Sequence, residues 1–85
     1  MSQEVMLMKT VQVLINTIDK INEFAKIAGK IDEELDLVSD RYIINGKSIM
    51  GIFSLNLSRP VQLTIYAEGS RLDEILALLD NFMVN

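Results

Sequence analysis

The sequence predicts an α+β fold in which helices cover one face of an open β-sheet. Several segments alternate β-branched or other apolar residues with polar ones, which indicates strands with one buried face. Between them lie segments with apolar residues at helical spacing. The connections are short, and no repeat or low-complexity stretch interrupts them. The 85 residues therefore predict the element order β-α-β-β-α-β-α in a single domain, residues 1–85.

The first predicted elements are a strand within Leu7 to Ile15 and a helix that begins at Ile18. The inward positions of the strand are Val11, Val13 and Ile15. The apolar stripe of the helix consists of Ile18, Ile21, Phe24, Ala25 and Ala28. Asn16 and Thr17 are candidate N-caps, and Gly29 is expected to end the helix in the left-handed conformation.

Two strands follow, within Glu34 to Ser39 and Arg41 to Asn45, and their short connection predicts a hairpin. The positions predicted to face the core are Leu35, Leu37, Tyr42 and Ile44. Asn45-Gly46 then indicates a turn, because glycine tolerates a positive φ.

The last strand is expected to open after Pro60, which has no N–H to donate to a ladder. Its inward positions are Val61, Leu63 and Ile65. Gly69 ends it, and Ser70 with Asp73 resembles a capping box for the final helix. The apolar stripe of that helix consists of Leu72, Ile75, Leu76, Leu79, Phe82 and Met83.

The most informative stretch is a short helix predicted behind Ser48, whose hydroxyl is placed to act as an N-cap. So short a helix cannot turn all of its large apolar residues inward. Ile52 and Leu55 are expected in the core. The residues left at least partly in water are Ile49, Met50 and Phe53. An exposed apolar cluster of this kind is typical of a docking surface for another protein.

The segment Lys47-Ser48-Ile49-Met50-Gly51, followed by apolar residues and Ser54-Leu55, resembles the second-helix segment of HPr, the phosphocarrier family of the bacterial sugar phosphotransferase system. The resemblance implies an HPr-like open-faced sandwich over nearly the whole chain. Its four-stranded antiparallel sheet would have the order 1-4-2-3, with three helices on one face. The resemblance also implies partner binding by Lys47, Ile49, Met50 and Phe53. In many Gram-positive members a dedicated kinase phosphorylates the serine at the position of Ser48.

The family's phosphoryl-transfer motif, Gly-(Ile/Leu)-His-Ala-Arg-Pro, is not retained. Thr17 stands at the histidine's place and Asp19 at the arginine's, and the sequence contains no histidine. A threonine hydroxyl forms a stable phosphate ester, and an aspartate repels a phosphoryl group that an arginine would bind. We therefore expect no phosphoryl relay through histidine. Thr17 is predicted to be an N-cap, with phosphorylation of Thr17 by the upstream enzyme as the alternative.

Composition and motifs exclude several other classes. A net charge of −4 with eight scattered basic residues argues against nucleic acid, and no apolar stretch approaches the roughly 20 residues that span a membrane. The acidic run Asp32-Glu33-Glu34, with Asp36 and Asp40, lacks the pattern of a calcium loop and is predicted to be solvated. Without a catalytic triad, a phosphate loop or a cluster of metal ligands, we expect neither an enzyme nor a cofactor or metal site. Nothing indicates export, so the cytoplasm is the expected location.

Two functions follow as hypotheses. The first is a regulatory HPr-like protein that binds phosphotransferase-system enzymes, HPr kinase or a transcription regulator, with phosphorylation of Ser48 as a switch. The alternative is an HPr-fold interaction module with no role in the phosphotransferase system, which forms a homodimer through the same apolar residues.

Overall fold

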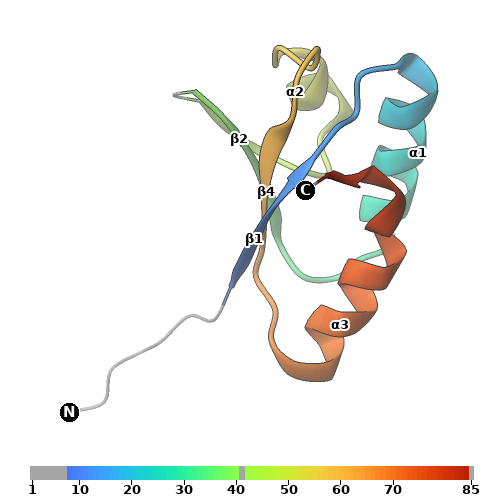
Figure 1. Ribbon diagram of the computed structural model, residues 1–85, viewed down its shortest axis with the longest axis vertical. Coiled ribbons are helices and arrows are strands. Elements are labelled where there is room, and N and C mark those ends of the chain that lie inside the picture. Colours follow the sequence, from blue (N-terminus) through green and yellow to red (C-terminus); the bar gives the residue numbers. More distant parts are fainter. Residues whose placement is uncertain (1–7, 41, 85) are drawn as a thin grey trace.

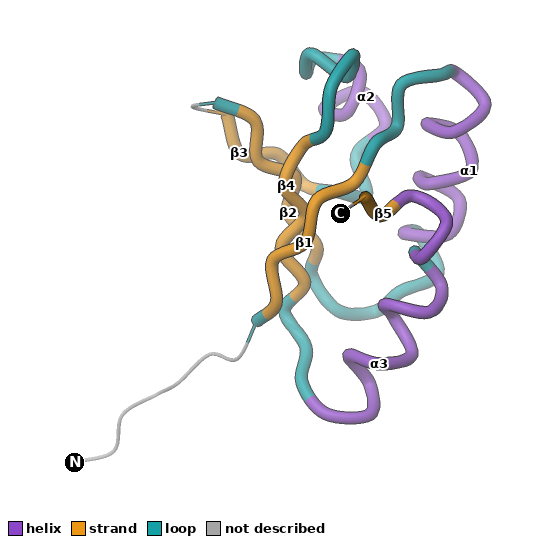
Figure 2. Tube along the Cα trace, in the orientation of Figure 1, coloured by secondary structure: helices purple, strands orange, loops and turns teal. Residues whose placement is uncertain are grey.

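The computed structural model describes residues 8–40 and 42–84, so Leu7 and Arg41 of the predicted strands lie outside the described residues. Its elements are β1 (Lys9–Val13), α1 (Ile18–Ala28), β2 (Leu35–Ser39), β3 (Tyr42–Asn45), α2 (Ile49–Phe53), β4 (Val61–Ile65), α3 (Gly69–Leu78), the 3₁₀ helix η1 (Asp80–Phe82) and β5 (Met83–Val84). The strands form one antiparallel sheet, and the helices lie together on one side of it (Figures 1 and 2). The predicted α+β class is confirmed.

The sheet has the order β3-β2-β4-β1-β5, which contains the expected 1-4-2-3 order and adds a fifth strand. We expected the final helix to continue to Met83, but α3 ends at Leu78 and Leu79 leaves the helical conformation at φ −102°, ψ 7°. Beyond it, Met83 pairs with Val13 on the outer edge of β1, and the N–H of Leu14 donates to the carbonyl of Phe82 at 2.8 Å. The end of the chain pairs with β1 because this satisfies backbone groups that an edge strand leaves open.

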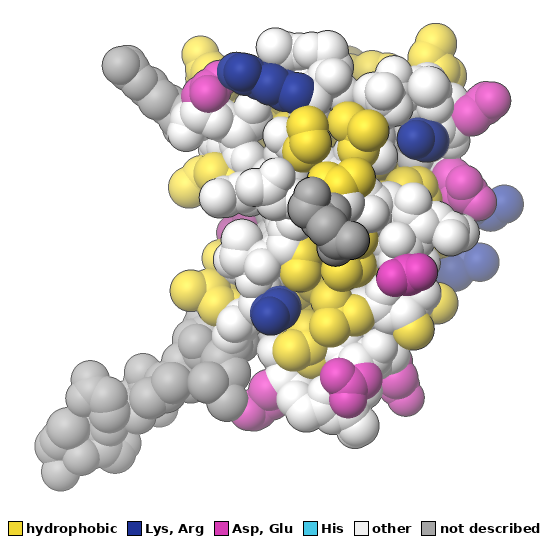
Figure 3. Space-filling model, in the orientation of Figure 1, with side chains coloured by type: hydrophobic (Ala, Val, Ile, Leu, Met, Phe, Trp, Pro, Cys, Tyr) yellow, Lys and Arg dark blue, Asp and Glu magenta, His cyan; other side chains and the backbone are white. Residues whose placement is uncertain are grey.

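The core consists of buried residues from both the sheet and the helices. On the face drawn in Figure 3, apolar side chains reach the surface along the middle, and charged side chains are scattered around them. Phe24 of α1 is fully buried and meets Phe82 edge to face, with ring centroids 5.5 Å apart. This arrangement favours the aromatic pair beyond its burial. Most predicted inward positions are buried as expected: Val13, Ile15, Ile21, Ala28, Leu35, Leu37, Val61, Leu63, Ile65, Ile75 and Leu79.

Two predicted inward residues are instead exposed. Ile18 is 67% exposed and Tyr42 is 68% exposed. Ile18 lies in the first turn of α1, at the end of that helix farthest from α3 (Figure 1), and Tyr42 begins the edge strand β3 beside its hairpin turn. In both cases the apolar pattern continues to the end of an element, past the point where the opposite layer covers it. Ile44, two residues further along β3, does pack against the core.

Two glycines behave differently from their predicted roles. Gly29 is right-handed, with φ −64°, because α1 ends in a tightened turn in which the N–H groups of Lys30 and Ile31 donate to carbonyls three residues back. Gly46 does not adopt a positive φ. A Cβ there would lie only 3.1 Å from the Cβ and the carbonyl oxygen of Leu35, so position 46 needs glycine for close approach of the backbone.

The start of α3 also differs from the prediction. Ser70 does not cap the helix with Asp73; the helix begins at Gly69, and Glu68 occupies the N-cap position without a side-chain cap bond. Gly69 has φ +62°, a conformation that glycine tolerates, and the helix begins two residues earlier than a Ser70 cap would place it.

Gly69→Ala is expected to lower the free energy of unfolding by about 1–2 kcal/mol, because an alanine is strained at this positive φ although no atom lies within 4 Å of the added Cβ. Urea unfolding measures the change. Gly29→Ala is the control, since its backbone is right-handed, and it should change stability less. Equal losses in the two variants would show that backbone strain at Gly69 is not the cause.

Candidate functional site

The site is built on the turn that precedes α2. The N–H of Lys47 donates to Asn45 Oδ1 at 2.8 Å, and the N–H of Ser48 donates to the Asn45 carbonyl at 3.0 Å. Ser48 Oγ in turn accepts from the N–H of Gly51 at 3.2 Å. Ser48 is therefore the N-cap of α2, as predicted, and it is exposed.

The helix that follows presents apolar side chains to solvent. Its exposed residues are Ile49 (36%), Met50 (78%) and Phe53 (50%), whereas Ile52 and Leu55 are buried. The predicted division between core and surface is confirmed. Below, the term docking surface denotes Ile49, Met50 and Phe53, the exposed residues that the sequence predicts to bind a partner. The helix lies close to β3, because a Cβ at Gly51 would be 3.3 Å from Cδ1 of Ile44. One side of so short a helix is thus occupied by the sheet, which leaves the docking surface outside.

Lys47, the fourth residue predicted to bind a partner, differs from the docking surface in its surroundings. Its side chain is half-buried, and its ammonium group donates to the carbonyl of Ile31, in the segment between α1 and β2. The pattern of α2 alone gives no indication of this contact.

Thr17 is the N-cap of α1, and its Oγ1 accepts from the N–H of Lys20 at 3.1 Å. The predicted structural role is confirmed. Helices α1 and α2 contact each other, and the start of α1 lies at the same end of the molecule as α2 (Figure 1). The exposed Ile18 is at this end too, and its position in the first helical turn was the one indication that the core would not cover it.

The acidic run does not form one solvated face. Glu33 is half-buried and its Oε2 accepts from Arg71 Nε at 2.8 Å, while Asp36 accepts from the hydroxyl of Tyr66 at 2.9 Å. The hydrogen bond from Arg71 holds the pKa of Glu33 below its usual value, against the opposing effect of burial. The bond to Asp36 raises the pKa of Tyr66.

Because the pKa of Glu33 is lower in the folded chain than in the unfolded one, its contribution to stability is present above about pH 4.5 and is lost as the pH falls through the folded pKa. Glu33→Gln should therefore flatten the acid side of the stability profile. Thermal unfolding between pH 3 and pH 7 measures this. The exposed Glu23 provides the matched variant, and an unchanged acid side in Glu33→Gln would contradict the assignment.

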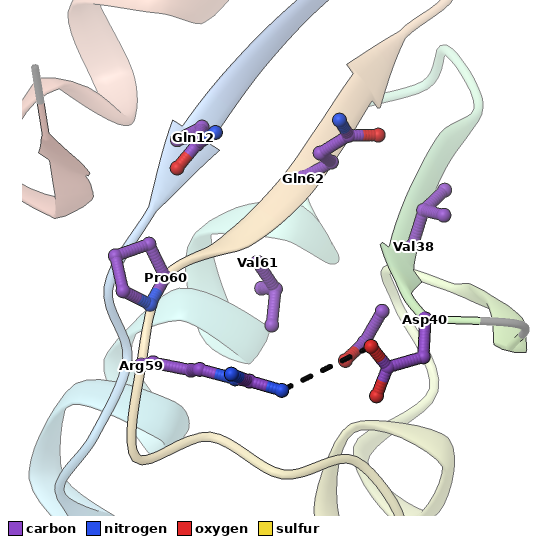
Figure 4. Close-up of a pocket in the computed structure, with 8 residues that line it drawn as sticks. Gln12, Val38, Asp40, Arg59, Pro60, Val61 and Gln62 are labelled. Carbon is purple, nitrogen blue, oxygen red and sulfur yellow. Dashed lines mark ion pairs between the residues drawn. The ribbon is translucent and has the colours of Figure 1, made fainter.

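A hollow of about 400 Å³ lies on the sheet face opposite the helices, where the β2–β4 ladder ends at the pair Val38 and Gln62. Figure 4 shows Arg59 reaching across it toward Asp40, with Gln12 and Gln62 on neighbouring strands. The Arg59–Asp40 pair is long, at 3.9 Å, and both side chains are two-thirds exposed. Such an exposed ion pair contributes little to stability. None of the docking-surface residues lines the hollow, so the hollow is separate from the site on α2.

Within residues 8–40 and 42–84, every helix is too short or too polar to cross a membrane.

Comparisons with known proteins agree with this architecture. The family described as "PTS HPr component phosphorylation site" matches residues 20–85, a range that begins after Thr17. The crystal structure of a phosphocarrier protein HPr from Bacillus anthracis str. Ames is 29% identical, with a TM-score of 0.68 over 89% of this chain and 95% of that chain. The crystal structure of HPr-C-His from Thermoanaerobacter tengcongensis is 25% identical, with a TM-score of 0.64 over 89% of this chain and 93% of that chain.

Proposed function

The chain belongs to the HPr family of the phosphotransferase system, and we propose that it is a regulatory member that binds other proteins and does not relay phosphoryl groups. One observation carries this proposal. The docking surface is exposed beside Ser48 in a sequence that contains no histidine. The chain thus keeps the α2 segment that suits it to bind a partner, but it lacks the imidazole through which reversible phosphoryl transfer proceeds.

The surroundings of Thr17 support the second half of the proposal. Its hydroxyl oxygen already accepts from the N–H of Lys20, and Asp19 places a carboxylate in the same turn of α1. A phosphoryl group on Thr17 would be a stable ester next to a negative charge. Such a group would not pass readily to a further acceptor.

Phosphoryl transfer can be tested with phosphoenolpyruvate, the upstream phosphotransferase-system enzyme and an HPr from B. anthracis as the positive control. We expect the control to be labelled and this chain to remain unlabelled. Labelling that disappears in Thr17→Ala would contradict the proposal, because it would make Thr17 a phosphoacceptor.

Ser48 is proposed as the regulatory position because its hydroxyl is exposed and adjoins the docking surface. Phosphorylation adds nearly two negative charges at neutral pH. That charge would weaken a partner that covers the apolar side chains closely and favour a partner that presents arginine.

Incubation with HPr kinase and ATP, followed by mass spectrometry, tests the switch. We expect a single phosphate on Ser48 that is lost in Ser48→Ala and retained in Ser54→Ala. Ser54 is a suitable control because it is exposed at the other end of α2. An unmodified chain, or a phosphate that survives Ser48→Ala, would remove Ser48 from the proposal.

Self-association through the same surface is the competing function, since exposed apolar residues also suit a homodimer. Sedimentation of the purified chain separates the two. A monomer that binds HPr kinase or a phosphotransferase-system enzyme supports the regulatory function. A dimer that Phe53→Glu converts to monomer, without binding to those enzymes, supports an interaction module.

A further inference from the structure

We propose that Lys47 is a positioning residue for the docking surface. Its ammonium group hydrogen-bonds the turn before α2 to the segment between α1 and β2, and its side chain does not contact the bound protein. This inference depends on the proposed role of α2 in binding, but the contacts that support it belong to the free chain.

The first support is the direction of the Lys47 side chain. It is half-buried, and its ammonium group donates to the carbonyl of Ile31. Ile31 is itself only 1% exposed, so this carbonyl belongs to a residue anchored in the core. The docking-surface residues are far more exposed, as Met50 at 78% illustrates. Lys47 and the docking surface thus face different surroundings although they are neighbours in sequence.

The second support is that the turn is also hydrogen-bonded to the first residue of β2. The N–H of Gly46 donates to the carbonyl of Leu35 at 2.7 Å, and a side chain at position 46 would collide with Leu35. The Lys47–Ile31 and Gly46–Leu35 bonds therefore hold two adjacent residues of the turn to points on either side of Glu33. Two such attachments fix the direction in which α2 leaves the turn.

The third support comes from Glu33, between these two points. Its Oε2 is bound by Arg71 of α3, whereas its Oε1 is buried without a hydrogen-bond partner among the described residues. The positive charge of Lys47 also helps to hold the pKa of Glu33 down. The segment thus contacts two cations, Lys47 before α2 and Arg71 of α3. Removal of the Lys47 charge would leave the Ile31 carbonyl without its hydrogen-bond donor and the Glu33 carboxylate with less nearby positive charge.

Lysine acetylation of the free wild-type chain, followed by mass spectrometry, provides a test without mutation. We expect Lys47 to react about tenfold more slowly than the exposed Lys30, because its nitrogen is part-buried and must leave its hydrogen bond to Ile31 before a reagent can reach it. Equal reaction rates in the free chain would overturn the proposal. Protection of Lys47 that appears only when HPr kinase is bound would also overturn it, since that result would make Lys47 a contact residue.

Amide hydrogen exchange in Lys47→Met is the second measurement. This variant keeps the apolar stem and removes the charge. Exchange should rise about tenfold at Gly46, Gly51 and Ile52, the change expected when one charge-assisted hydrogen bond is lost, and should stay unchanged at Leu63 in β4. Lys30→Met, which removes a neighbouring exposed charge, should leave all four amides unchanged.

A selective rise supports a positioning role, whereas unchanged exchange in Lys47→Met overturns it. A uniform rise at all four amides, as in global destabilisation, also contradicts it. Should Lys47→Met not fold, the ¹⁵N ammonium signal of Lys47 in the wild-type chain decides, because a bonded ammonium gives a slowly exchanging signal. The acetylation rates, the amide exchange and the ammonium signal are all measured on the free chain, and only the comparison with bound HPr kinase depends on the proposed function. Failure of the proposed function would therefore leave the free-chain results unchanged.

Discussion

Replacing Phe53 by glutamate is expected to weaken binding to HPr kinase or a phosphotransferase-system enzyme about 30-fold or more, the loss typical of an aromatic residue at the centre of an interface. Phe53 is half exposed at the last residue of α2, one helical turn after Ile49 and Met50, which complete the docking surface. A carboxylate there would have to lose its hydration when the partner covers it, and no cation of the docking surface would compensate. Isothermal titration measures the affinity.

Leu78→Glu is the matched control for this experiment. Leu78 is 49% exposed against 50% for Phe53, and it lies on α3 rather than α2. Both variants add the same charge to an equally exposed apolar position, so only Phe53→Glu should affect binding, and their unfolding midpoints should change by similar small amounts. Equal losses of affinity in the two variants would show that net charge, rather than the docking surface, governs recognition.

The largest effect on stability is expected for Phe24→Ala, which should lower the free energy of unfolding by about 3–5 kcal/mol. Phe24 is completely buried, and its ring meets Phe82 at nearly a right angle. The truncation would leave a cavity between α1 and the C-terminal turn, and it would remove the aromatic contact that holds η1 in place. For a domain of this size, such a loss is a large part of the total stability.

Phe53→Ala isolates the effect of burial in this measurement, because it makes the same chemical change at a half-exposed position. We expect it to cost about 1 kcal/mol or less, from the smaller apolar area that Phe53 removes from water. Chemical denaturation monitored by circular dichroism gives both values. A loss in Phe24→Ala no greater than that in Phe53→Ala would contradict the core described above.

Local sequence patterns predicted many features that depend on neighbouring residues, although the Ser70–Asp73 cap did not form. Thr17 and Ser48 cap their helices as expected, because a cap bond joins residues three apart. The alternation in β4 correctly predicted that Val61, Leu63 and Ile65 are buried in the core. The same reasoning was wrong where an element ends. Ile18 and Tyr42 continue their patterns, and a pattern carries no information about where the covering layer stops.

The sequence by itself determined the class of fold, the family resemblance, the absence of histidine and the division of α2 between buried Ile52 and the exposed docking surface. Each of these follows from the types of residues present or from their spacing along a single element. Only the tertiary structure decided the fifth strand, the attachment of Lys47 to Ile31 and the pairing of Glu33 with Arg71. The last two contacts join residues 16 and 38 positions apart. Their geometry is set by how the layers pack, which the period of a single helix or strand does not contain.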